Sequence, residues 1–249
     1  MTSVAVFSLA GAPGVTTLAM ALATAWPMAE PVCVVEADLS GGDIAAWWRL
    51  PVWPGLVDLA AASRSGQDQE DGAVGTHTQV LPGGLRVCVA PSTADRTAGA
   101  VDLLAHNPKA LTAASGTTVV DLGRVAPHSA AAGLLESCDN AVLVTTGDIA
   151  QLKRVKDSAA GLFVSSPRVG LVVVGGRGST REISAAVGMP VWGHIPTDPK
   201  AAAFLAGQAE AVRVDRRPLI KAARDLARAL LRHEEPSAGV QAALVAETP

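Results

Sequence analysis

Apolar residues occur along the chain in short continuous runs, separated by segments with helical spacing. The runs are rich in valine, and they cover residues 4–7, 32–35, 85–90, 117–120, 141–146, 169–174 and 190–196. A strand with one face in water alternates apolar and polar residues, whereas continuous runs are typical of strands buried on both faces. Strands that alternate with helices form a parallel sheet. The pattern therefore predicts a single-domain α/β fold, with a mostly parallel sheet and helices on both faces.

Helical spacing and end signals place helices between these strands. We expect helices over residues 18–26, within 92–111, after Asp148, over 180–187 and over 213–232. Asp148 is a favourable helix cap, and Gly188 is typical of the position that follows a helix. Residues 63–79 are polar and aperiodic and are predicted to be a mobile loop. We expect one domain over residues 1–233 and a flexible tail over residues 234–249.

Composition narrows the class of protein. The chain has 249 residues, 49% of them hydrophobic, so it can bury a large core, and its net charge of −3 offers no general polycation to DNA. Aromatic residues make up only 3%, which argues against a stacking surface for single-stranded nucleic acid. Cys33, Cys88 and Cys138 lie in apolar runs without zinc-site or redox spacing, so we expect buried, reduced thiols. No run has the length of a leader or a membrane span, and a cytoplasmic protein is expected.

The first strand leads into a glycine-containing turn, AGAPGVTT at residues 10–17, and then into small helix-forming residues. Strand, glycine turn and helix are the layout of a phosphate-binding loop. Unpaired N–H groups at the start of such a helix attract an anion together with the helix dipole, and a threonine in the first turn can bind Mg²⁺. A connection that binds no phosphate would show the same pattern, so this stretch alone leaves both interpretations open.

Two residues in the turn depart from the phosphate-loop consensus GxxxxGK[ST]. Val15 stands where the consensus has lysine, and Pro13 lacks a backbone N–H. A lysine–phosphate hydrogen bond contributes about 1.5–3 kcal/mol, so its loss would weaken nucleotide binding by about tenfold to a hundredfold. Its loss also removes positive charge that would stabilise a phosphate during transfer.

Acidic residues follow two of the predicted strands. Glu36 and Asp38 come after the second run, and Asp121 comes after residues 117–120. Ligands of parallel α/β sheets bind at the carboxyl ends of the strands. Asp38 is therefore a candidate for positioning a water molecule, and Asp121 for holding Mg²⁺ through water. Turn formation or helix capping is the alternative role for Glu36 and Asp38.

Residues 213–232 combine an apolar stripe with a basic one and carry a net charge of +5. A helix docked on the sheet, with its basic face in water, is the favoured interpretation. Contact with DNA or with an anionic membrane are the alternatives. Elsewhere, Trp47, Trp48 and Trp53 are interpreted as core or partner contacts, and His194 as a structural histidine within an apolar run.

Several segments together resemble the MinD/ParA group of deviant phosphate-loop ATPases. Within that group the chain looks closest to the CpaE/TadZ-like proteins associated with pilus assembly and to related actinobacterial proteins. Residues 10–17 correspond to the group's KGGxGKT[ST], residues 34–38 (VVEAD) to its strand ending in DxD, and residues 119–121 (VVD) to its second acidic motif. Residues 141–152 (AVLVTTGDIAQL) and 188–199 (GMPVWGHIPTDP) resemble its later strand–helix junctions.

The resemblance implies a set of ligand-binding residues. The nucleotide phosphates would lie against the loop, which is formed by Gly11, Ala12, Pro13, Gly14, Val15, Thr16 and Thr17. Thr16, Asp38 and Asp121 would hold Mg²⁺, in part through water. Asp38 would also position the attacking water if the protein is active.

The chain differs from the group at the positions where group members contact the nucleotide. The two lysines of the group correspond to Ala10 and Val15, and its adenine-reading asparagine falls near Gly175 and Gly176. The first acid of its DxD is Glu36. With both lysines missing, we expect weak binding of ATP and Mg²⁺, or none, and weak or no hydrolysis.

The resemblance implies a pseudo-ATPase that forms a homodimer and positions or regulates a localised protein machine, such as a pilus or secretion apparatus. It would be cytoplasmic, with association at the membrane periphery or the cell pole. One alternative is an active MinD/ParA-type ATPase, in septum or pole positioning, in which Arg177 or another basic residue replaces the lysines. Another is a DNA-partitioning protein that uses the basic helix. ATP turnover would favour the first alternative, and salt-sensitive DNA retention the second.

Overall fold

The computed structural model describes residues 2–11, 14–27, 30–65, 73–112, 116–162, 168–176, 178–210 and 213–232. Within these residues the sheet has eight strands in the order β3-β4-β2-β5-β1-β6-β7-β8. They are β1 (Thr2–Ser8), β2 (Val32–Glu36), β3 (Gln79–Val80), β4 (Arg86–Cys88), β5 (Thr117–Arg124), β6 (Asn140–Thr146), β7 (Arg168–Val174) and β8 (Val191–Ile195). All neighbouring pairs are parallel except β3 with β4. The predicted single-domain α/β fold is confirmed.

The central position of β1 follows from its apolar run. Val4 and Val6 pack into the apolar cluster on one face of the sheet, and Ala5 and Phe7 pack into the cluster on the other face. All four side chains are buried. Because a continuous apolar strand is stable only when both faces are covered, β1 lies between β5 and β6 with helices above and below it.

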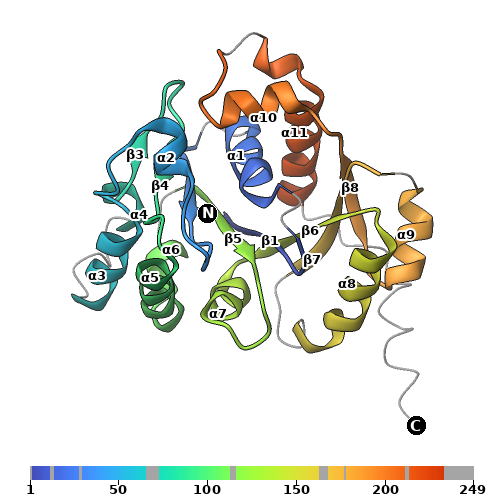
Figure 1. Cartoon of the computed structure of the whole chain (residues 1–249), viewed down its shortest axis with the longest axis horizontal. Helices are drawn as coiled ribbons and strands as arrows, with labels where there is room; N and C mark the ends of the chain where they lie inside the picture. Colours follow the sequence, from blue (N-terminus) through green and yellow to red (C-terminus); the bar gives the residue numbers. More distant parts are fainter. Residues whose placement is uncertain are drawn as a thin grey trace.

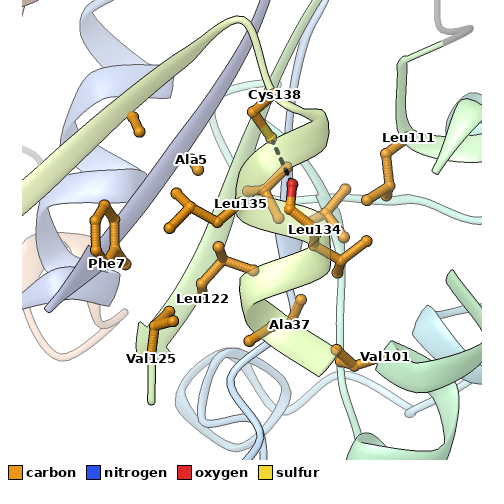
Figure 2. Packing of buried hydrophobic residues seen from close by; sticks show 14 of the residues in the cluster. Ala5, Phe7, Ala37, Val101, Leu111, Leu122, Val125, Leu134, Leu135 and Cys138 are labelled. Carbon is orange, nitrogen blue, oxygen red and sulfur yellow. Dashed lines mark hydrogen bonds between the residues drawn. The ribbon is translucent and has the colours of Figure 1, made fainter. Parts of the chain in front are cut away.

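Helices cover both faces of the sheet (Figure 1). One face packs against α1 (Val15–Ala25), α2 (Ile44–Trp48), α10 (Pro199–Leu205) and α11 (Pro218–Leu231). The other face packs against α3 (Leu56–Ser65), α4 (Ala73–Thr76), α5 (Ala94–His106), α6 (Lys109–Thr112), α7 (Ala130–Ser137), α8 (Ile149–Leu162) and α9 (Thr180–Val187). In the second layer, Leu134 and Leu135 of α7 pack with Leu122 of β5 (Figure 2).

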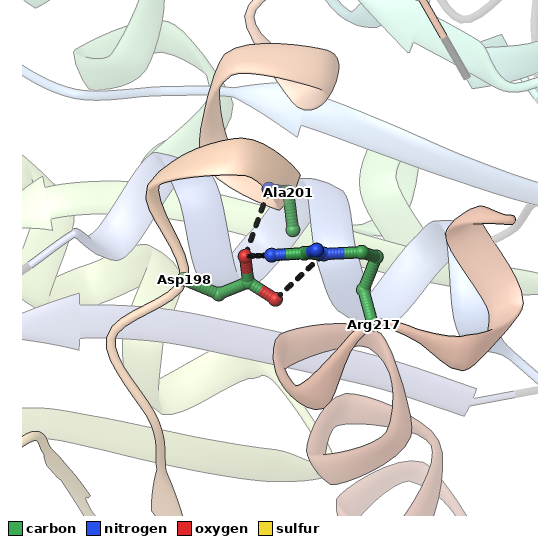
Figure 3. A network of polar contacts seen from close by, with 3 residues as sticks. All are labelled: Asp198, Ala201 and Arg217. Carbon is green, nitrogen blue, oxygen red and sulfur yellow. Dashed lines mark hydrogen bonds and ion pairs between the residues drawn. The ribbon is translucent and has the colours of Figure 1, made fainter. Parts of the chain in front are cut away.

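The helix near the C-terminus is docked on the sheet. α11 packs against α1 and β8, and its apolar stripe, which includes Ile220 and Leu226, is buried. A buried carboxylate fixes its start: Asp198 accepts hydrogen bonds from the Ala201 N–H at 3.1 Å and from Arg217, whose Nε lies at 3.1 Å (Figure 3). The Arg217 guanidinium holds the pKa of Asp198 below its usual value. The docked-helix interpretation is confirmed, and the stripe could meet a membrane only if α11 left the sheet.

Some predicted boundaries differ from the structure. Residues 63–79 were expected to form one mobile loop, but α3 extends to Ser65, α4 covers Ala73–Thr76 and β3 starts at Gln79. The apolar residues Leu59 and Val74 anchor α3 and α4 on the core, which composition alone does not reveal. Residues 66–72 and the expected tail, 234–249, lie outside the described residues.

Two helix boundaries also differ. The expected helix within 92–111 is split into α5 and α6, and the expected helix over 213–232 begins only at Pro218, after a 3₁₀ turn over Val214–Arg216. Proline suits the first turn of a helix because its missing N–H has no partner there. Across the described part of the chain, no helix combines the length and apolar character needed to cross a membrane.

Shortening a side chain under α11 is expected to destabilise the protein. Ile220 is fully buried, so Ile220→Ala should lower the free energy of unfolding by about 2–5 kcal/mol. Its exposed neighbour provides the control, since Lys221→Ala should change this free energy by less than about 0.5 kcal/mol. Urea titrations followed by circular dichroism would measure both. Equal losses would show that α11 does not pack as described.

Candidate functional site

The loop between β1 and α1 lies at the carboxyl end of the central strand. Gly14 precedes α1 with φ of 84°, a left-handed conformation that suits glycine. Gly14, the N-cap, provides no side-chain hydrogen bond to the first turn of α1, and N–H groups at a helix start are suited to an anion. Ala12 and Pro13, which were predicted to contact phosphate, lie outside the described residues.

Neighbouring strands and helices hold this loop in place. The Ser8 hydroxyl donates toward the carbonyl oxygens of Gly11 and Gly123, at 3.5 and 3.4 Å. Gln151 of α8 accepts a hydrogen bond from the Thr146 N–H at 3.2 Å, and its Nε2 lies 3.5 Å from the position that a Cβ on Gly11 would take. Sequence reasoning missed Ser8 and Gln151 as site residues, although Gln151 lies in a segment that resembles a family junction.

Val15, at the position of the consensus lysine, belongs to the hydrophobic core. It is the first residue of α1, and its side chain is 6% exposed within the cluster that contains Val6 and Leu18. Val15 therefore differs from the consensus lysine in more than charge, because its side chain contributes to packing on the sheet. A lysine here would have to extend its stem past this cluster to reach a phosphate.

Asp121 is a fully buried residue in the carboxyl-terminal half of β5, opposite Glu36, the last residue of β2. Its Oδ1 accepts a hydrogen bond from the Gly123 N–H at 3.1 Å, while its Oδ2 has no hydrogen-bond partner in the part of the chain that the structure describes. Burial raises the pKa of Asp121 to about 7; the Thr16 hydroxyl and the Gly123 N–H oppose this shift, and Glu36 and Asp38 add to it. A buried oxygen without a partner suits a cation or its bound water.

Asp38 lies next to Asp121, just beyond β2. Its Oδ1 accepts hydrogen bonds from the Ser40 N–H at 2.8 Å and from the Ser40 hydroxyl at 2.7 Å. Its other carboxylate oxygen lies against Gly123, where any side chain would collide with it and where φ is 56°. Thr16, Asp38 and Asp121 thus lie close together near the carboxyl ends of β2 and β5, and their role as Mg²⁺-binding residues stays a prediction.

Glu36 has a structural role. Its Oε1 accepts hydrogen bonds from the N–H groups of Asp43 and Ile44, at 2.7 and 2.9 Å, and its Oε2 accepts one from Ala90 at 2.9 Å. The carboxylate therefore joins the end of β2 to the start of α2 and to the segment after β4. This matches the helix-cap alternative, and burial raises the pKa of Glu36.

An apolar cavity of about 190 Å³ opens beside the first turn of α1. It is bounded by α1, the ends of β7 and β8, α10 and α11, and is lined by Gly14, Thr17, Leu18, Val174, Ile195, Pro196, Thr197, Asp198, Pro199, Ala202 and Leu219. Gly175 lies at its edge, since a Cβ there would lie 3.1 Å from the Thr197 hydroxyl. The cavity and the loop are continuous through Gly14 and Thr17, which border both.

The remaining candidate residues lie elsewhere. Cys33, Cys88 and Cys138 are free and buried, as predicted. The side chain of His194, expected to be structural within an apolar strand, is exposed because β8 is the edge strand of the sheet. Trp48 donates its indole N–H to the Leu205 carbonyl at 3.1 Å, whereas Trp53 is exposed. Among the described residues, no set of three or more histidine, cysteine or acidic side chains is arranged to hold a metal ion.

The sheet order and the glycine turn after β1 define the class of fold, which is that of the phosphate-loop NTPases. Two acidic residues, Asp38 and Asp121, lie near the carboxyl ends of its parallel strands. No protein-family model and no curated protein matches the chain. Among solved structures, the chain is similar to a ParA family ATPase from Chlorobium tepidum TLS, with 20% identity, a TM-score of 0.71, and coverage of 91% of this chain and 97% of the other.

Two solved MinD structures are similar to a comparable degree. The cell division ATPase MinD of Pyrococcus furiosus is 18% identical with a TM-score of 0.74, over 93% of this chain and 98% of the other. The septum site-determining protein MinD of Pyrococcus horikoshii OT3, solved with Mg-ADP, is 17% identical with a TM-score of 0.74, over 92% of this chain and 95% of the other. The chain therefore has the fold of the MinD and ParA ATPases.

The raised pKa of Asp121 predicts an unusual pH dependence of stability. The folded state retains a proton on Asp121 up to about pH 7, whereas an unfolded aspartate releases it near pH 4. Folding therefore loses stability as the pH rises between these values, by at most about 1.4 kcal/mol per pH unit. Asp121→Asn, which is neutral at every pH, should remove this slope and be more stable than the wild type at pH 8.

Urea titrations of both proteins at pH 5, 6, 7 and 8 would measure the effect. The advantage of Asp121→Asn should shrink toward pH 5, where Asp121 is protonated in the folded protein. Asp38→Asn is the control and should leave most of the slope in place, because burial is the largest cause of the raised pKa of Asp121 and the charge of Asp38 only adds to it. A constant difference between wild type and Asp121→Asn across this range would contradict the prediction.

Proposed function

We propose that this protein is a degenerate MinD/ParA-like ATPase that acts as a dimerising scaffold or regulatory factor, with weak or no ATP hydrolysis. The observation that carries the proposal is the burial of Val15 in the core at the position where a phosphate loop has lysine. Ala10, at the position of the group's second lysine, is also uncharged. The phosphate end of the site therefore lacks both cations that hold and activate a triphosphate.

The remaining parts of the site fit a nucleotide in part. The uncapped first turn of α1 is suited to phosphate, and the apolar cavity beside it is suited to a flat base or ribose. Asp121, with its unpartnered oxygen, Asp38 and Thr16 would hold Mg²⁺ through water together with oxygens of the nucleotide. These residues support weak binding of ATP and Mg²⁺, while the missing lysines argue against efficient turnover.

An active ATPase is the second candidate, because Asp38 and Asp121 are both present at the strand ends. In that case Asp38 would position the attacking water, and a basic residue from elsewhere would replace the lysines. Arg177, which sequence reasoning considered for this role, lies outside the described residues. Arg124 is exposed at the end of β5, next to Ser8 in the strand register, and is another candidate.

The binding partner and the cellular location are inferred from the resemblance and are part of the proposal. A homodimer that positions a pilus or secretion machine, of the CpaE/TadZ kind, would work in the cytoplasm, at the membrane periphery or at a cell pole. DNA or anionic lipid remains a weaker proposed partner of the basic face of α11. Arg224 and Arg228 on this helix already pair with Asp215 and Asp225, at 3.3 and 3.5 Å.

Restoring the lysines tests the proposal. Calorimetric titration of the wild type with Mg-ATP and Mg-ADP should show millimolar or undetectable binding. The double variant Ala10→Lys/Val15→Lys should bind Mg-ATP at least tenfold more tightly, because each lysine adds a charge-assisted hydrogen bond. It should also be less stable, since Val15 leaves the core.

Two controls complete this experiment. Ala185→Lys, on the exposed side of α9, adds a lysine away from the site and should leave nucleotide binding unchanged. Light scattering on the same samples would report nucleotide-dependent dimerisation. Micromolar binding of Mg-ATP by the wild type, with turnover abolished by Asp38→Ala, would reject the pseudo-ATPase in favour of the active enzyme.

A further inference from the structure

Exposed apolar side chains gather at the lateral edge of the sheet formed by β3. In the described ranges, the large hydrophobic residues with high exposure are Val52 (42%), Trp53 (70%), Val80 (57%) and Ile149 (84%). Three of them lie at or beside β3, and we call Val52, Trp53 and Val80 the β3-edge surface. An exposed tryptophan with apolar neighbours marks an interaction site more often than chance.

The β3-edge surface is held in one conformation. Gln79 of β3 donates from Nε2 to the carbonyl oxygens of Pro51 and Pro54, at 2.7 and 2.9 Å. The loop is fixed at its other end by the Leu56 N–H, which donates to the Val89 carbonyl at 2.9 Å. Because residues 51–54 are fixed before any partner arrives, binding there costs little ordering entropy.

Positive charge borders this surface. Arg86 lies opposite Val80 in the β3–β4 register, and Arg49 precedes the loop. Both are exposed and have no ion-pair partner among the residues that the structure describes. Arg49 follows α2 with φ of 53°, a conformation in which glycine or asparagine is the usual residue. The surface is thus suited to a segment that is both apolar and acidic.

The chain itself contains such a segment after α11. Residues 233–249, HEEPSAGVQAALVAETP, carry three glutamates and no lysine or arginine, and residues 240–246 are apolar except for Gln241. We propose that residues 233–249 of one copy of this protein bind the β3-edge surface of a second copy. Apolar residues 240–246 would contact Trp53, and the glutamates would lie near Arg49 and Arg86.

Chain length favours a second copy over the same molecule. α11 ends beside β7, since Arg168 donates from Nη2 to the Ala229 carbonyl at 3.4 Å. β7 lies six strand positions from β3, which corresponds to about 29 Å through the core. Val240 follows Arg232 by eight residues and Leu244 by twelve, which reach at most about 28 and 42 Å when fully extended. The path around the surface is longer than the straight line, so the run could contact the β3-edge surface of its own molecule only with the linker almost fully extended, whereas the surface of a neighbouring copy carries no such limit.

This contact would join different surfaces on the two copies. Such a contact closes as a symmetric dimer when two copies exchange residues 233–249 reciprocally, and otherwise forms rings or open chains. It goes beyond the proposed function, because it needs neither nucleotide nor the residues at the carboxyl edge of the sheet. Self-association through it would therefore persist in the absence of ATP.

Photo-crosslinking in the full chain tests the contact directly. We would replace Trp53 with p-benzoyl-phenylalanine, mix isotope-labelled and unlabelled full chains, irradiate, and map crosslinked peptides by mass spectrometry. The expected product joins position 53 to residues 233–249 of a differently labelled copy. Products confined to one label, products to other segments only, or no product would overturn the proposal. The same probe at Ala185 should give no crosslink to residues 233–249.

Concentration-dependent light scattering without nucleotide provides the second measurement. Trp53→Ala and Leu244→Asp should each weaken self-association at least tenfold, whereas Ile149→Ala, which removes an exposed apolar residue elsewhere, should not. Arg49→Glu/Arg86→Glu should also weaken it, and combination with Glu234→Arg/Glu235→Arg should partly restore it. Equal behaviour of Trp53→Ala and the wild type would overturn the proposal. Because no nucleotide is present, this result does not depend on the outcome of the lysine restoration.

Discussion

Burial of the parallel sheet on both faces is the constraint on which the rest of this structure depends. β1 is apolar on both sides, so helices must cover both, and α1 covers one of them. The helix starts at Val15, whose side chain joins the core at once. In a phosphate loop the same position carries the lysine that binds the ligand. A side chain at this position can either pack in the core or bind an anion. In this chain Val15 packs in the core.

The acids at the carboxyl edge show the same balance between stability and function. Glu36 is buried, but three backbone N–H groups satisfy its carboxylate, so it stabilises the fold. Asp38 is partly exposed and bonded to Ser40. Asp121 is buried with one oxygen unpartnered in the described structure, and its ionisation is unfavourable. A buried carboxylate that is costly to ionise and has an oxygen without a structural partner is typical of a ligand-binding site.

Much of the fold follows from the sequence, because continuous valine-rich runs are typical of strands buried on both faces and the segments between them have helical spacing. The shared location of Asp38, Asp121 and Thr16 was predictable from the strands, since parallel strands that follow one another have their carboxyl ends on the same side of the sheet. The burial of Val15, the hydrogen bond from Ala90 to Glu36 and the cavity beside α1 were not predictable. Each depends on how helices and strands pack against one another, which a local sequence pattern does not give. The short helices α2 and α10 span only five and seven residues, too few to establish a helical period, and were missed for that reason.

The two proposals describe a protein in which assembly is separated from nucleotide chemistry. A nucleotide can control assembly only by its difference in affinity for the assembled and free states. Without lysine at positions 10 and 15, few groups remain that could make binding of a partner depend on the terminal phosphate of a nucleotide. The β3-edge surface lies on a lateral edge of the sheet, whereas the loop, Asp38 and Asp121 lie at the strand ends. A surface in that place can evolve its own partner without affecting the loop, so loss of the lysines need not end self-association. Under the proposed function, Asp121 is the residue that supports a ligand at this end of the sheet, because it is buried with one carboxylate oxygen unpartnered in the described structure.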